Sequence, residues 1–202
     1  MSAGYIFTER SELNTAVDLW ISDVAAAATT YGDINTWDVS AITDFSDLFD
    51  WSNNLFSTYS DISNWDVSNG TDFSYMFFGS NFNYDISSWD VSSGTDFSYM
   101  FGETLFNQDV GSWDVSNGTN FSYMFGDGNI NQDLSNWDVS SGTNFSKMFA
   151  YNEAFNEDIR GWDVSNGTNF SYMFEGAENF NQNIRGWDVS NGTNFSYMFE
   201  GA

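Results

Sequence analysis

Aspartates that recur at one place in a repeated motif are the residues of this sequence with the clearest potential for chemistry. The tetrapeptide Trp-Asp-Val-Ser occurs seven times, and its tryptophans are separated by 28, 24, 24, 24, 25 and 25 residues. If such repeats stack, neighbouring carboxylates repel each other by about 0.8 kcal/mol at ~5 Å even in water. A calcium ion would relieve this repulsion, because it binds several carboxylate and carbonyl oxygens at flexible geometry. The candidate metal ligands are Asp38, Asp66, Asp90, Asp114, Asp138, Asp163 and Asp188.

A second interpretation of these aspartates needs no metal. An aspartate at a turn accepts hydrogen bonds from nearby backbone N–H groups while it faces solvent. Because no Asp-x-Asp-x-Asp-Gly loop occurs, the sequence favours this interpretation, and calcium is the alternative. In either case we expect stacked carboxylates to titrate above their free pKa values, so that salt and mild acidification stabilise the fold.

A file of tyrosines is the second set of candidate functional residues. Each lies between phenylalanine and methionine positions, and the spacing of Phe170, Met173 and Phe174 predicts the inner face of a short helical turn. The tyrosines are therefore expected to point outward and to offer amphipathic rings to a protein or glycan ligand. Equally, the rings could only cover the grooves between successive turns. The candidate binding residues are Tyr75, Tyr99, Tyr123, Tyr172 and Tyr197, and Lys147 takes one place in the file.

The period determines the elements that must position these side chains. A unit of about 24 residues is too short to bury its own apolar face, so it must stack on its neighbours. Trp162 and Val164 are two residues apart, as on one face of a strand, and Thr168 is placed to cap the helical turn. The sequence thus predicts an α/β solenoid of seven coils of about 24–25 residues, each with a short strand and a short helical turn.

The two ends of the chain differ. Residues 1–31 lack the repeat, and Thr8 can cap a helix with an apolar stripe at helical spacing, so we expect an N-terminal helical cap there. Residues 32–202 form the predicted repeat solenoid. Its last repeat keeps all its apolar positions, which predicts an uncapped end that is either truncated from a longer array or covered by another molecule. The stripe comprises Leu13, Ala16, Val17, Trp20, Ile21 and Val24.

Two files of glycine predict special backbone geometry. Gly79, Gly102, Gly126 and Gly176 follow the Met-Phe pair, where a helix would end at a residue with positive φ. A second file precedes the threonines, where we expect a turn with positive φ and, as the alternative, close approach of another backbone. This file comprises Gly70, Gly94, Gly118, Gly142, Gly167 and Gly192.

Composition excludes several classes of function. The formal net charge is −25 with only four lysines and arginines, which argues against nucleic acid and against an anionic membrane surface as partners. The chain has no histidine and no cysteine, and every polar residue recurs in a file, whereas an enzyme needs a unique constellation. No apolar stretch is long enough for membrane insertion, and no secretory signal is visible at the start.

The repeated strings carry a resemblance to a known family. Phe-Asn-Gln-Asp at 106–109, Trp-Asp-Val-Ser at 113–116 and Thr-Asn-Phe-Ser-Tyr-Met-Phe at 119–125 resemble the BspA-like leucine-rich-repeat surface proteins. The resemblance covers residues 32–202. It implies a leucine-rich-repeat-like solenoid and a role in surface display or adhesion.

These observations predict a non-enzymatic, extracellular or cell-surface repeat protein. It would present an acidic, aromatic-striped face to a protein or glycan ligand. The main alternative is a structural protein whose copies assemble head to tail into a filament. A minor alternative is binding to ice or a mineral surface, suggested by the regular file of threonines, although helix capping would already explain these threonines.

Overall fold

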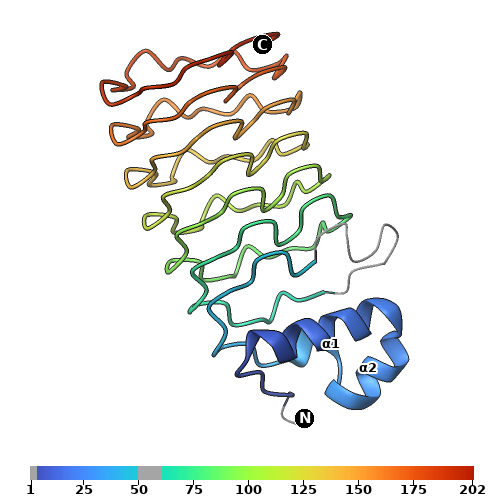
Figure 1. Cartoon of the computed structure of the whole chain (residues 1–202). Coiled ribbons are helices and arrows are strands. Elements are labelled where there is room, and N and C mark those ends of the chain that lie inside the picture. The colour runs from blue at the N-terminus through green and yellow to red at the C-terminus, as the bar shows by residue number, and fades with distance from the viewer. Residues whose placement is uncertain (1–3, 50–60) are drawn as a thin grey trace.

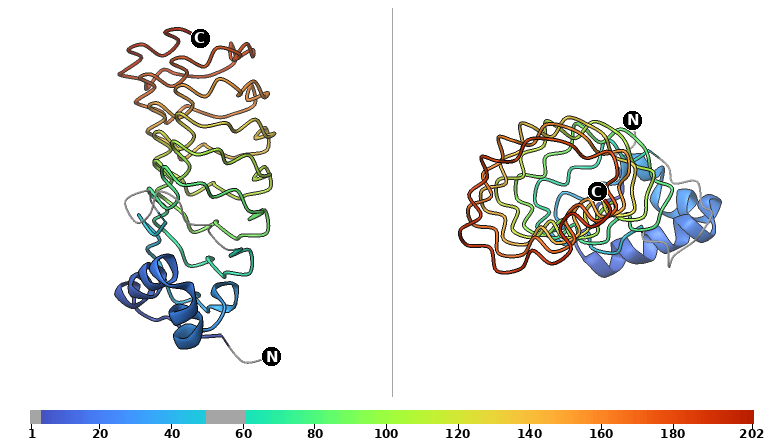
Figure 2. Two further views of the ribbon diagram at one scale, coloured as in Figure 1. Left: turned by 90° about the vertical axis from the view of Figure 1, so that its right-hand side faces the viewer. Right: turned by 90° about the horizontal axis from the view of Figure 1, so that it is seen from above.

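The computed structural model describes residues 4–49 and 61–202. Residues 1–3 of the predicted cap and 50–60 of the predicted repeat region lie outside the described residues. The repeats wind into successive coils that stack along one axis, with two helices at the N-terminal end and the C-terminus at the opposite end (Figure 1). Seen from above, successive coils overlie one another, each displaced a little sideways from the one before (Figure 2).

Helix α1 spans Arg10–Ser22 and buries one apolar stripe, with Leu13, Ala16, Val17 and Trp20 in the core. The predicted cap residue is wrong, because Glu9 occupies the N-cap and its side chain makes no capping hydrogen bond. The Trp20 indole packs edge-on against Trp37 of the first coil, at 5.8 Å between ring centroids. This contact joins the helix to the file of tryptophans inside the coils.

Helix α2 spans Val24–Tyr31, and Asp23 caps it by accepting a hydrogen bond from the Ala26 N–H at 3.0 Å. A 3₁₀ turn, η1, follows at Ile34–Thr36. Val24, predicted as part of the first helix's buried stripe, is half exposed because the chain bends at Asp23 and α2 begins there. The two helices thus meet at a sharp corner rather than forming one longer helix.

Backbone hydrogen bonds join each coil to the next. Phe97 N–H donates to the Asn120 carbonyl at 2.9 Å, and Tyr99 N–H donates to the Ser122 carbonyl at 2.9 Å. Alternate residues therefore donate along the stack, as in a parallel sheet. Among the described residues, each coil pairs with the next through one residue in a parallel β-bridge. These bridges connect, in order, Asp44, Asp72, Asp96, Asn120, Asn144, Asn169 and Asn194.

The predicted helical turn is absent from the described coils. Between the bonds to the next coil, Met100 N–H donates to the Phe97 carbonyl and Gly102 N–H to the Tyr99 carbonyl, which are turn bonds across three residues. Tyr99 has φ of 59°, a left-handed conformation that interrupts any right-handed helix. The predicted strand at Trp162 and Val164 is not formed either, because the bridges lie five residues beyond the valine. The classification as a leucine-rich-repeat-like α/β solenoid stays a prediction.

Aromatic rings fill the interior in files that run along the stack. Phe97 and Phe121 stack at 5.7 Å between centroids with an interplanar angle of 6°. Trp137 and Trp162 stack at 6.4 Å and 5°. The indole N–H of Trp137 donates to the Val110 carbonyl of the preceding coil at 2.9 Å. The seven tryptophans of the Trp-Asp-Val-Ser motifs all donate their indole N–H to a backbone carbonyl, so their burial leaves none of these donors unpaired.

The glycines before the threonines provide space for a ring. None of them has a positive φ, so the predicted left-handed turn is wrong. A Cβ on Gly118 would lie 2.4 Å from Cζ of Phe121 and 2.9 Å from the Val115 carbonyl oxygen. The ring of Phe121 thus lies directly over Gly118. The predicted close approach of a backbone is found here only for the Val115 carbonyl, which belongs to the same coil.

Candidate binding surface

Each aspartate of the Trp-Asp-Val-Ser motif closes a small turn. Oδ1 of Asp66 accepts hydrogen bonds from the backbone N–H of Ser68 at 3.1 Å and from its hydroxyl at 2.6 Å. The other six predicted metal ligands make the same backbone bond to the serine two residues ahead, at 3.0 or 3.1 Å; they are Asp38, Asp90, Asp114, Asp138, Asp163 and Asp188. These contacts support the interpretation in which the aspartates stabilise turns.

The turn bonds outweigh repulsion between successive carboxylates. The Ser116 hydroxyl and then its N–H lower the pKa of Asp114 below its ordinary value. The N–H and hydroxyl of Ser190 lower the pKa of Asp188, and repulsion from Asp163 is the smallest of the opposing effects. The expectation of raised pKa values is therefore wrong at these positions, because a hydrogen bond to the charged form favours that form.

The described part of the chain contains no group of three or more acidic, histidine or cysteine side chains that could hold a metal ion. The aspartate file offers one carboxylate per coil, and one oxygen of each is already engaged in its turn. Calcium ligation would need at least six oxygens around one ion. The donors present do not form such a set, and the calcium alternative gains no support from their arrangement.

The tyrosines and Lys147 lie in one file on the outside of the ladder, which we call the tyrosine edge. Tyr75 and Tyr99 stack at 4.4 Å and 6°, and Tyr172 and Tyr197 stack at 5.0 Å and 20°. Each residue has a positive φ, between 55° and 59° along the file, and each side chain is half-buried or exposed, unlike the phenylalanine and methionine beside it, which are buried in every coil before the last. The edge comprises Tyr75, Tyr99, Tyr123, Lys147, Tyr172 and Tyr197.

A second file with positive φ lies four residues after the first, and the prediction of positive φ is confirmed at Gly79 and Gly176, with φ of 65° and 64°. It contains Glu103, Asp127 and Tyr151, at 55°, 47° and 55°. Gly102 and Gly126 are not in it, although both were predicted there. The signal that would have found this file is the alignment of these three residues with Gly79, Gly176 and Gly201, which adopt positive φ without strain.

Carboxylates flank the tyrosine edge and accept hydrogen bonds from one phenol of the edge and from one phenol of the second file. The Tyr123 hydroxyl donates to Oδ2 of Asp127, and the Tyr151 hydroxyl donates to Oε1 of Glu175 at 2.7 Å. Burial and then the hydrogen bond to Asp127 raise the pKa of Tyr123, and the bond to Glu175 raises that of Tyr151. We call the carboxylates of Glu103, Asp127, Glu175 and Glu200 the acidic flank. The charges of these carboxylates contribute to raising the pKa of both Tyr123 and Tyr151, so this part of the surface is electronegative as well as aromatic.

The threonine and asparagine files are structural ladders. The Thr119 hydroxyl donates to the Thr95 carbonyl of the preceding coil at 3.1 Å, so these residues do not cap helices as predicted. The Asn131 N–H donates to Oδ1 of Asn107 at 3.0 Å, and Asn131 in turn accepts from the Asn156 N–H at 3.0 Å. Both files hold adjacent coils in register.

The last coil exposes side chains that other coils bury. Val189, Phe195 and Phe199 are 37%, 41% and 48% exposed, whereas their counterparts in the preceding coil are at most 1% exposed. We call this surface the end face. It lines an apolar hollow whose residues are Ile184, Trp187, Val189, Phe195, Met198 and Phe199.

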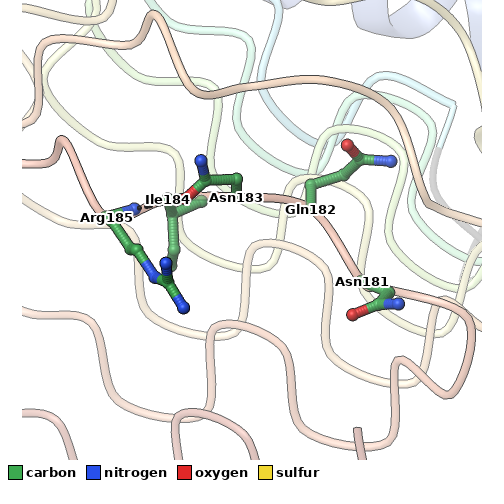
Figure 3. Close-up of a pocket in the computed structure, with 5 residues that line it drawn as sticks. All are labelled: Asn181, Gln182, Asn183, Ile184 and Arg185. Carbon is green, nitrogen blue, oxygen red and sulfur yellow. Dashed lines mark hydrogen bonds between the residues drawn. The ribbon is translucent and has the colours of Figure 1, made fainter.

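A second hollow adjoins the end face and is polar. Figure 3 shows its five consecutive residues, from Asn181 to Arg185, on one extended segment of the last coil. Because no second segment contributes a side chain, the hollow does not bring together a nucleophile, a base and an orienting group as catalysis requires.

Within the described residues, no helix has the length and apolar character needed to cross a membrane.

Comparisons with known proteins identify a family and no individual relative. No curated protein and no solved structure matches the chain. A family model matches twice, over residues 19–129 and 106–202, and the overlap of the two matches reflects the repeats. The chain therefore belongs to the family described as "Mycoplasma protein of unknown function, DUF285".

Proposed function

We propose that the protein is a non-enzymatic repeat protein, extracellular or on a cell surface, that uses the tyrosine edge and its acidic flank for binding or adhesion. The observation that carries the proposal is the continuity of this surface over successive coils. Large rings and carboxylates are presented outward on a backbone fixed by bonds between coils. Aromatic rings on a rigid support supply contact area at small entropic cost, as binding surfaces require.

The proposal includes two finer statements. The stack of coils is a repeat solenoid of the leucine-rich-repeat type, and the protein is related to the BspA-like surface proteins that its motifs resemble. A binding role is supported by the recurrence of the Trp-Asp-Val-Ser aspartates in all seven repeats and of the edge tyrosines in five of them, which repeats one surface along the stack.

The proposal is tested by immobilising the protein on beads and measuring retention of a panel of extracellular-matrix proteins and glycans. The comparison is a triple variant with Tyr75→Asn, Tyr99→Asn and Tyr123→Asn, because asparagine tolerates positive φ and leaves the net charge unchanged. Loss of a retained ligand from the variant would support the proposal. Equal retention by both proteins would contradict it. Protease treatment of intact cells that express the protein tests whether it is outside the cell.

End-to-end assembly of copies is the second candidate, and the exposed end face favours it. Helices α1 and α2 occupy the opposite end of the stack (Figure 1), so a head-to-tail contact would place the end face against helices rather than against another coil. Light scattering at high protein concentration tests this candidate. A strictly monomeric protein would exclude it, whereas a Phe195→Ser variant that abolishes a measured polymer would support it.

A further inference from the structure

The tyrosine edge already holds one cation of the chain itself. Lys147 replaces a tyrosine in the file, and its Nζ lies 5.3 Å from the centroid of the Tyr172 ring. That distance is within the ~6 Å at which an ammonium group is attracted to the face of an aromatic ring. An ammonium group and a ring are therefore interchangeable at this position of the edge, with the same backbone conformation in both cases.

The acidic flank beside Lys147 has no cation of its own. Among the described residues, the recorded ion pairs are those of Arg10 with Asp44 and of Arg160 with Asp158, and neither involves the flank. Asp127 and Glu175 instead accept bonds from phenols. A carboxylate has about four lone-pair sites, so each can accept further N–H donors from a ligand.

We propose that this part of the tyrosine edge, together with Tyr151 and the acidic flank, binds a polypeptide segment rich in lysine or arginine. The inference rests on the proposed function and specifies its ligand. Lysine and arginine combine the two features that the surface complements: a positive charge for the acidic flank, and a cation or planar guanidinium for the rings of Tyr151 and Tyr172. The net charge of −25 steers such a segment toward the protein, and the edge determines where it binds.

The test uses the full chain and a fluorescein-labelled peptide of eight lysines separated by glycines, with binding measured by fluorescence anisotropy at physiological salt. The edge variant carries Glu103→Gln and Asp127→Asn. The matched control carries Glu9→Gln and Asp18→Asn, which remove the same two charges from exposed positions at the N-terminal end. We expect the edge variant to weaken binding at least 3-fold more than the control, since screening limits the effect of distant charges.

Two further variants test the ring contacts, the first of them at constant net charge. Tyr151→Asn removes a half-exposed ring at constant net charge and should weaken binding roughly 2- to 5-fold. Lys147→Tyr completes the file, removes the competing ammonium group and should tighten binding by a similar factor. This second variant places a native residue type of the file in its native backbone conformation, so a fold defect would not mask the result. Circular dichroism checks the fold of each variant.

The outcomes distinguish this inference from the proposed function. Equal weakening by both charge variants, with no effect of either ring variant, would show that the protein attracts the peptide only as a polyanion and would overturn the inference. Failure of the peptide to bind would also overturn it. Retention of a glycan or an uncharged protein by the tyrosine edge would keep the proposed function but show that the ligand class is wrong.

Discussion

Alanine at Gly118 should destabilise the protein, whereas alanine at Gly161 should not. The added Cβ at position 118 would lie 2.4 Å from Cζ of Phe121 and 2.9 Å from the backbone oxygen of Val115. Phe121 is completely buried between stacked rings, so it cannot move aside without displacing its neighbours. At Gly161 no atom lies within 4 Å of the added Cβ. Neither glycine has a positive φ, so the comparison isolates space from backbone strain.

The magnitude follows from two opposing effects. Overpacking of a buried site costs about 1–3 kcal/mol. Replacing glycine with alanine also restricts the unfolded chain, which stabilises the fold by about 0.4–1 kcal/mol. The free energy of unfolding should therefore fall by about 1–2 kcal/mol for Gly118→Ala and rise by about 0.4–1 kcal/mol for Gly161→Ala.

Urea denaturation followed by tryptophan fluorescence measures both changes. A third variant, Phe121→Leu, removes the ring atoms that the new Cβ would meet, so Gly118→Ala should cost less in that background than in the parent protein. A Gly118→Ala variant as stable as Gly161→Ala would refute the reasoning. It would show that Phe121 and its neighbours can make room for the added Cβ, so that the packing of this ring does not require glycine.

Three other predictions concern the turns and the end of the stack. Ser116→Ala should lower the free energy of unfolding by about 0.5–1 kcal/mol at pH 7, near the lower end for a hydrogen bond because the pair is exposed. The pKa of Asp114 in the folded protein lies below its ordinary value of 3.8, so the bond to Ser116 stabilises the fold fully at pH values above 3.8. The difference in unfolding free energy between the parent and Ser116→Ala should vanish as the pH falls through the folded pKa. A difference that grows in acid would contradict this reasoning. Glu103→Gly should raise the melting temperature slightly, because relief of roughly 1–2 kcal/mol of left-handed strain exceeds the about 0.4–1 kcal/mol that glycine costs by loosening the unfolded chain. An unchanged or lower melting temperature would show that the Glu103 side chain makes another stabilising contact. Addition of one more repeat after residue 202 should stabilise the chain by about 2–4 kcal/mol, because it buries the end face. An added repeat with serine at its apolar positions should give no such stabilisation. Calorimetry of both extended proteins measures the difference.

The sequence by itself determined the repeat and its buried files. The spacing of the Trp-Asp-Val-Ser motifs predicts coils that stack, and the constancy of Phe121, Trp137 and Val139 across repeats predicts that these positions face the interior, where they lie at 0–3% exposure. The apolar stripe of the first helix was readable from Leu13 to Trp20, because its spacing fits the helical period of 3.6 residues, but the bend before Val24 was not.

Only the tertiary structure decided the conformation of the Phe-Ser-Tyr-Met-Phe segments. Apolar residues at i, i+3 and i+4 fit one face of a helix. A chain of consecutive turns, in which every second residue donates its N–H to the next coil, buries the same residues. The donors of Phe97 and Tyr99 find their partners 23 residues away in sequence, in a coil that no local pattern describes. This competition also placed the tyrosines at positive φ and so created the edge. The sign of the aspartate pKa shifts was hidden for the same reason, because charge spacing is visible in a sequence but the geometry of the turn bonds is not.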